Sequence, residues 1–161
     1  MKPLEIRIVH RLSAALQKEM DKLRELLAEA SSYSVDTVHP RIIGSLLHDF
    51  YTGLERAFQK ICKEIEGEMA EGRGWHKALL ENMSLEIPEV RPRVITEELA
   101  NDLDDYLRFR HLFRGIYGFE LDVERMRPLF DNLGVIFSEI EAQLQTFLNT
   151  LTQIAQRRQQ E

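Results

Sequence analysis

A regular helical repeat near the C-terminus constrains the fold more than any other feature of this sequence. Apolar residues recur there at alternating steps of four and three, at Met126, Phe130, Leu133, Phe137, Ile140, Leu144, Phe147, Leu151 and Ile154. This spacing places them on one face of a helix. The face suits antiparallel packing in a bundle or a coiled-coil-like seam between two copies. Pro128 indicates that the helix either begins there or is kinked after a short first turn.

Three other segments have the same periodicity, so we predict four helices over about 3–31, 40–70, 96–117 and 123–158. Pro40 suits the first turn of the second helix, Thr96 is a good N-cap for the third, and Gly118 can terminate it. Residues 71–95, between the second and third helices, read as an insertion with a short helix around 75–84. The predicted fold is one all-α domain over 1–161, an up-and-down four-helix bundle with a short helical insertion between helices 2 and 3.

Composition excludes several classes of protein. The formal net charge of −6 argues against a non-specific nucleic-acid coat protein, and no apolar run approaches the roughly 18 residues that span a membrane. The N-terminal residues do not read as a signal peptide, and the single cysteine, Cys62, fits a reducing cytoplasm. Neither zinc-ligand spacing, nor a Glu-x-x-His pair, nor a phosphate-binding glycine loop is present. We therefore expect a cytoplasmic protein with no metal and no cofactor.

The stretch RFRHLFRGIYGFEL, residues 108–121, gathers cations in this acidic chain. Arg110 falls on the apolar stripe of the third helix, between Tyr106 and Phe113, and an unpaired guanidinium is costly to bury there. One interpretation is structural: Arg110 pairs with an acidic residue of another helix, while Arg108 and Arg114 are solvated. The other interpretation is a site that binds phosphate.

The phosphate interpretation points to metal-independent RNA cleavage. His111 suits proton transfer because the reference pKa of histidine, about 6.5, lies near neutral pH. Arg108, Arg110 and Arg114 suit phosphate binding because a guanidinium can bind phosphate through two N–H donors. A second proton carrier would be needed, either from another copy of the chain or from His76 or Tyr106.

Other polar residues admit simpler roles. His48 and Asp49 suit a hydrogen-bonded contact between helices. Trp75 is expected to anchor the insertion on the bundle, with His76 following it to the surface. Arg56, Lys60 and Lys63 form a basic stripe that reads as a solvated helix face. Gly44 and Gly53, inside the second helix, are tolerable where a neighbouring helix approaches closely.

Three segments in order resemble the HEPN superfamily, and within it the HepT-like proteins of prokaryotic toxin–antitoxin modules. They are LLHDFYTGLERAFQKICKEIEG, GWHKALLENM and PRVITEELANDLDDYLRFRHLFRGIYGFELD, within a likeness over about 40–125. The resemblance implies a HEPN-like bundle, a homodimer, and a nucleotidyltransferase antitoxin as partner. It also implies an RNase toxin that the partner neutralises by transferring AMP to a tyrosine near the catalytic motif.

The family motif is an arginine, four to six residues, then a histidine, commonly followed two residues later by a tyrosine. Placing the arginine on Arg110 and the tyrosine on Tyr117 puts Gly115 at the histidine position. The resemblance then implies Tyr117 as the AMP acceptor and Arg110 as the motif arginine. The chemistry of the stretch adds His111 for proton transfer and Arg114 as a phosphate ligand, so we predict Arg110, His111 and Arg114 as the catalytic residues.

Three hypotheses follow for the function. The first is an endoribonuclease toxin whose rearranged site pairs with its copy across a dimer cleft. The second is a catalytically silent HEPN protein that binds a nucleotidyltransferase or RNA. The third is a helical interaction module with no nucleic-acid role.

Overall fold

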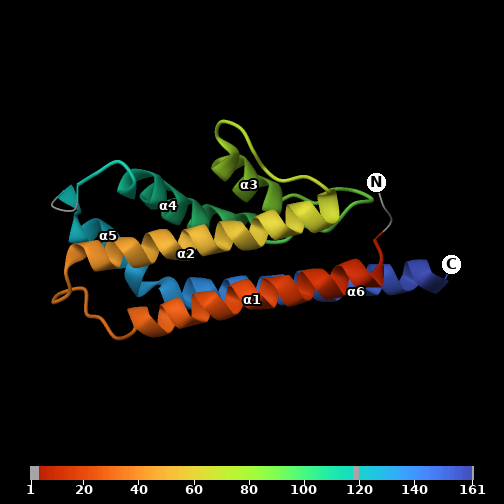
Figure 1. Cartoon of the computed structure of the whole chain (residues 1–161), viewed down its shortest axis with the longest axis horizontal. Coiled ribbons are helices and arrows are strands. Elements are labelled where there is room, and N and C mark those ends of the chain that lie inside the picture. The colour runs from red at the N-terminus through yellow and green to blue at the C-terminus, as the bar shows by residue number, and fades with distance from the viewer. Residues whose placement is uncertain (1–3, 118–119, 161) are drawn as a thin grey trace.

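The computed structural model describes residues 4–117 and 120–160, and its regular structure is helical (Figure 1). The α-helices are α1 (Ile6–Ala30), α2 (Pro40–Ile61), α3 (Trp75–Met83), α4 (Glu97–Phe113), α5 (Val123–Asp131) and α6 (Leu133–Gln160). A π-helical turn, η1 (Cys62–Glu66), continues α2. The described residues contain no strand, only an isolated bridge between Ile87 and Arg91. The predicted all-α class is confirmed.

The four long helices form a closed ring of packed neighbours. Helix α1 packs on α2 and α6, and α4 packs on α2 and α6. Figure 1 shows α1 and α6 along one side of the bundle and α2 and α4 along the other, with successive long helices running in opposite directions. Helix α3 lies outside the ring, against α2 and α4. This is the predicted up-and-down bundle with a helical insertion.

The apolar stripes read from the sequence form the core of the bundle. In α6 the buried members are Leu133, Phe137, Ile140, Leu144, Phe147 and Leu151, and in α1 they are Val9, Leu12, Leu16, Met20 and Leu23. The α6 stripe therefore packs inside the bundle of one chain, one of the two arrangements that its spacing allowed, rather than being left exposed as a seam for a second copy. No helix among the described residues is long and apolar enough to cross a bilayer.

Helix boundaries differ from the predicted ranges where local chemistry interrupts the α-helix. The second helix changes to a π turn after Ile61 and ends at Gly67, whose φ of 82° is the left-handed geometry that glycine adopts readily. The fourth predicted helix is two helices: α5 contains Pro128 and ends at Asp131, and α6 begins at Leu133. Proline lacks an N–H, so Pro128 removes the hydrogen bond to the carbonyl four residues before it, within α5, whereas the break itself lies one turn after Pro128. The terminator predicted at Gly118 lies outside the described residues.

The glycines of α2 lie where other helices approach. A Cβ on Gly53 would lie 2.8 Å from Leu23 Cδ2 in α1, and one on Gly44 would lie 2.7 Å from Phe113 Cε2 in α4. Both contacts are shorter than real Cβ atoms show. The close approach inferred from the sequence is thus confirmed. It brings α1 and α4 against α2, the helix that carries the candidate site.

Exchanging Gly53 for alanine should destabilise the protein. Alanine gains about 1 kcal/mol of helix propensity, but overpacking a buried site costs about 1–3 kcal/mol. Leu23 is only 2% exposed and cannot move aside freely. We expect Gly53→Ala to lower the free energy of unfolding by about 1 kcal/mol. Gly134→Ala is the matched control: no atom lies within 4 Å of its Cβ, so it should stabilise slightly. If urea denaturation shows the same increase in the free energy of unfolding for Gly53→Ala and Gly134→Ala, the prediction is wrong.

Candidate functional site

The cations of α4 do not form one cluster. Arg108 is exposed and pairs with Asp104 of its own helix, with Nε 2.8 Å from Oδ2. His111 and Arg114 are also exposed, and neither side chain forms a hydrogen bond or ion pair within residues 4–117 and 120–160. Only Arg110 turns into the bundle, with its side chain 12% exposed. The structure thus separates Arg110 from the residues predicted to act beside it.

Arg110 binds two residues of α2. Its Nε lies 3.1 Å from Glu55 Oε1 and donates a hydrogen bond to Thr52 Oγ1 at 3.2 Å. The structural interpretation of Arg110, an ion pair with an acidic residue of another helix, is confirmed. The N–H groups on Nη1 and Nη2 make no hydrogen bond within the described part of the chain. The ion pair therefore fixes the side chain while its terminal donors stay available.

The carboxylate of Glu55 also holds a histidine. His76 Nδ1 lies 2.5 Å from Glu55 Oε2, and the His76 ring stacks on Trp75 with centroids 3.7 Å apart. Glu55 is 3% exposed, so α2, α3 and α4 meet on one buried carboxylate. His76 does not simply follow Trp75 to the surface, as the sequence suggested, but turns to Glu55. A carboxylate on Nδ1–H leaves Nε2 of a neutral imidazole free to accept a proton.

Glu55 is the functional candidate that sequence reasoning missed. A signal for it existed: Arg110 on an apolar stripe required an acidic partner, and Glu55 lies one helical turn after Tyr51, on the inner side of α2. Periodicity gives the face of a helix but not its neighbours, so it could not select Glu55 from the other acidic residues of the chain.

An open cleft of about 560 Å³ lies beside this ion pair. Its lining includes four cations, Arg56, Lys60, Lys63 and Arg110, and two buried carboxylates, Glu19 and Glu55. The basic stripe of α2 and η1 faces solvent, as predicted, and it forms part of the wall of this open cleft.

Glu19 is held ionised by its neighbours. Burial raises the pKa of its carboxyl, but the hydrogen bond from Lys60 Nζ, 2.8 Å from Oε1, and the charges of Lys60 and Lys22 outweigh it. The net pKa is lowered from its ordinary value. At neutral pH Glu19 and Lys60 therefore form an ion pair, in which Glu19 neutralises the charge of Lys60.

The rim of the cleft is tied to α2 by a side chain. Gln59 Nε2 donates to the Ala70 carbonyl at 2.8 Å, and the Ala70 N–H donates to Gln59 Oε1 at 2.9 Å. Gly72 and Gly74 follow in the same loop with φ of 87° and 74°, in the left-handed region. These bonds hold the loop that carries Met69, so the cleft is formed without a bound ligand.

Tyr106, an alternative proton carrier in the sequence interpretation, lies in the core. It is 1% exposed, and its hydroxyl donates to the Leu129 carbonyl at 2.7 Å. Burial, with the charges of Asp102 and Asp105, raises the pKa of this phenol well above its ordinary value. It therefore stays neutral at physiological pH and has a structural role, joining α4 to α5.

Two tyrosine variants test the structural role of the Tyr106 hydroxyl. Tyr106→Phe should lower the free energy of unfolding by about 1–2 kcal/mol, because the Leu129 carbonyl loses its buried donor. Tyr51→Phe should be neutral or stabilising, since the buried Tyr51 hydroxyl has no hydrogen-bond partner among the described residues. Urea denaturation of both variants measures the two effects, and a larger loss for Tyr51→Phe would refute this assignment.

Tyr117 lies beyond the end of α4 and is 69% exposed. Its backbone N–H donates to Glu120 Oε2 at 3.3 Å. A modification acceptor must be reachable by another enzyme, and the exposure of Tyr117 meets that requirement. Gly118 and Phe119, which follow it, lie outside the described residues.

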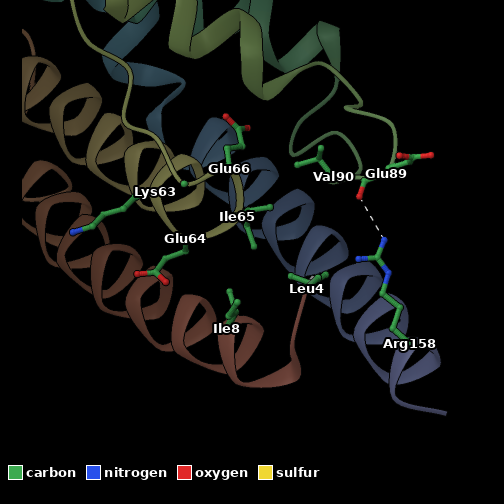
Figure 2. Close-up of a pocket in the computed structure, with 10 residues that line it drawn as sticks. Leu4, Ile8, Lys63, Glu64, Ile65, Glu66, Glu89, Val90 and Arg158 are labelled. Carbon is green, nitrogen blue, oxygen red and sulfur yellow. Dashed lines mark hydrogen bonds between the residues drawn. The ribbon is translucent and has the colours of Figure 1, made fainter. Parts of the chain in front are cut away.

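A second hollow, of about 360 Å³, lies near the start of α1 and the end of α6. Figure 2 shows Leu4, Ile8 and Val90 around it, with Lys63 pointing away. Arg158 donates to the Glu89 carbonyl at 3.4 Å across its edge. None of the described residues that line it is a histidine, and none of the described residues forms a cluster suited to a metal ion. The cleft beside Arg110 is therefore the better candidate for chemistry.

A family model described as HepT-like protein matches residues 42–151, about two thirds of the chain. The match includes Glu55, His76 and Arg110, so the three elements that meet at the candidate site all lie within it. Neither the curated proteins nor the solved structures give a significant match.

Proposed function

Since the chain belongs to the HepT-like family of the HEPN superfamily, we propose that it is the toxin component of a toxin–antitoxin module and a metal-independent endoribonuclease. The observation that carries the proposal is the shared carboxylate: Glu55 holds both Arg110 and His76 beside an open cleft. A guanidinium and an imidazole in one place supply charge stabilisation and proton transfer, the two requirements of RNA cleavage without metal.

The proposed reaction is attack of the RNA 2′-hydroxyl on the neighbouring phosphate. His76 Nε2 takes the hydroxyl proton, O2′ forms a bond to phosphorus, and the bond from phosphorus to the 5′-oxygen breaks. The leaving 5′-oxygen takes a proton from water or from a second histidine. The terminal N–H groups of Arg110 bind the charged phosphoryl oxygens as the bonds change. The products are a 2′,3′-cyclic phosphate and a 5′-hydroxyl.

The exposed residues at the end of α4 complete the proposal. In a homodimer, His111 and Arg114 of one copy can serve the cleft of the other, His111 as the second proton carrier and Arg114 as a phosphate ligand. Arg108 would give up an exposed pair with Asp104, which contributes at most about 1 kcal/mol, to bind RNA. A nucleotidyltransferase antitoxin would neutralise the protein by transferring AMP to Tyr117.

Cleavage of a mixed RNA pool in EDTA tests the proposal. We expect wild type to cleave, His76→Ala and His111→Ala to lose roughly 10²–10⁴-fold in rate as general acid–base residues do, and His10→Ala to match wild type. His10 is an exposed histidine of α1 that does not line the cleft. If only His111→Ala loses cleavage activity, the general base is His111 rather than His76. No cleavage by wild type would overturn RNase activity.

A silent binding partner is the second candidate, favoured by one observation. Gly115 stands where the family motif has its histidine. In that case the protein still binds its nucleotidyltransferase, and Tyr117 remains the acceptor. Incubation with the cognate nucleotidyltransferase and ATP should then add the mass of AMP to wild type but not to Tyr117→Phe. An unchanged mass for wild type would remove the role of Tyr117.

A further inference from the structure

We propose that the cleft beside Arg110 binds single-stranded RNA, with one base stacked on Trp75 and the backbone phosphates on Arg56 and Lys63. The choice of RNA as ligand rests on the proposed function. The binding site itself rests on charge, on an aromatic side chain and on a preformed cleft.

The local charge of the cleft favours a polyanion. Two of the four cations in the cleft are already engaged, Lys60 with Glu19 and Arg110 with Glu55. Arg56 and Lys63 form no ion pair with any residue of 4–117 and 120–160, and both are exposed. The cleft thus keeps two uncompensated positive charges in a chain of net charge −6. Uncompensated cations in a concave site attract a polyanion. The rest of the protein surface carries net negative charge and repels the polyanion, which favours binding in the cleft.

The tryptophan of the cleft offers a surface for base stacking. Trp75 lines the cleft, and its stack on His76, with an interplanar angle of 28°, holds the ring in place. Proteins that bind single strands combine a basic groove with aromatic side chains on which unpaired bases stack. A ring already fixed loses little conformational freedom when a base binds. The same arrangement puts the phosphate next to that base close to His76 and Arg110.

The cleft is preformed. The two hydrogen bonds between Gln59 and Ala70 hold the rim, and the volume of about 560 Å³ lies within the range of small-molecule sites. The cleft is therefore large enough to take one flipped-out nucleotide while the rest of the strand runs along α2. A duplex, whose bases are stacked internally, could not present a base to Trp75.

Trp75 is the only tryptophan of the chain, so its fluorescence reports directly on the cleft. The probe is a short mixed-sequence RNA oligonucleotide with 2′-O-methyl groups, which has no nucleophile and cannot be cleaved. We expect saturable quenching with the full-length protein, and an affinity that falls with salt. For single strands the log–log slope changes by about 0.7 for each phosphate that the protein neutralises. Arg56→Ala/Lys63→Ala should therefore reduce the slope by about 1.4.

Two controls keep the test specific. Arg41→Ala/Arg157→Ala removes the same charge from exposed positions that do not line the cleft, and it should leave the slope unchanged. Trp75→Leu keeps an apolar anchor but removes stacking, so affinity measured by filter binding should fall about 10-fold, whereas Trp75→Phe should keep most of it. Circular dichroism checks that each variant is folded.

The outcomes separate this inference from the proposed function. Quenching by the methylated strand without cleavage of ordinary RNA would support the site and overturn the RNase. Cleavage of RNA with no quenching, or equal slopes for the two double variants, would overturn the site and leave the RNase. Equal affinity for free AMP and for the strand would also overturn it, because the cleft would then bind a mononucleotide.

Discussion

Arg91→Met is expected to lower the free energy of unfolding by about 3–5 kcal/mol, because it breaks a buried charge network. The Arg91 side chain is 0% exposed, and its Nε donates to Glu66 Oε1 at 2.7 Å. Nη1 donates to the carbonyls of Leu85 and Pro92 at 2.9 and 3.1 Å, and Nη2 to that of Asn82 at 2.9 Å. Methionine fills similar space but leaves these acceptors without a donor.

The measurement is urea denaturation beside Arg93→Met, a change of the same kind two residues away. Arg93 is exposed and forms no ion pair among the described residues, so its replacement should change stability by less than about 0.5 kcal/mol. Because Arg91 joins η1, α3 and the segment before α4, limited proteolysis of Arg91→Met should first cut within 67–95. Similar unfolding midpoints for the two variants would refute the structural role of Arg91.

Glu55→Ala should be the second large effect, a loss of about 2–4 kcal/mol, because two positively charged or protonatable groups lose their common partner. Glu55 is buried, while Arg110 and His76 keep side-chain exposures of 12% and 27% and can gain some water. The expected loss is therefore somewhat smaller than for a wholly enclosed pair. Glu55→Gln preserves shape and an acceptor oxygen but also removes the counter-charge of Arg110, so it should lose less stability than Glu55→Ala and still fold.

Glu55→Gln should affect RNA cleavage more strongly than it affects stability. Glu55→Gln should fold but lose RNA cleavage, since an amide orients the imidazole of His76 poorly and stabilises no positive charge on it. The control is Glu64→Ala, which removes the Arg11–Glu64 pair at the surface, where Arg11 is 68% exposed. Surface pairs contribute about 0–1 kcal/mol, so Glu64→Ala should remain stable and active. A Glu55→Gln variant with full activity would exclude the shared carboxylate from the mechanism.

Local sequence patterns were sufficient for the helices of this protein. The apolar stripes, Pro40 in the first turn of α2 and the Thr96 cap, which accepts from the Leu99 N–H at 3.2 Å, are all found where the sequence placed them. Each depends on residues within a few turns of one another. The π turn after Ile61 was not predicted, and the interruption expected at Pro128 lies one turn later, at Asn132, because both details depend on how the ends of helices fit against neighbouring elements.

The candidate site was predicted only in part. Arg110 was identified as a buried cation that needs either an acidic partner or a phosphate, and the structure supplies the partner. The roles of His111, Arg114 and Tyr117 remain predictions, and the structure places all three on the surface. His76 was named as a possible second proton carrier, but its contact with Glu55 could not be derived from sequence, because its side-chain direction depends on where the insertion docks.

The sequence by itself determined the all-α class, the faces that pack in the core, and the need of Arg110 for a counterion, because these follow from periodicity and from the cost of burying charge. Only the tertiary structure decided that the counterion is Glu55 and that His76 shares it. Helical periodicity is a property of neighbouring residues. The meeting of α2, α3 and α4 on one carboxylate depends instead on how distant segments pack, and Gly44 and Gly53 set that packing by admitting α4 and α1 close to α2.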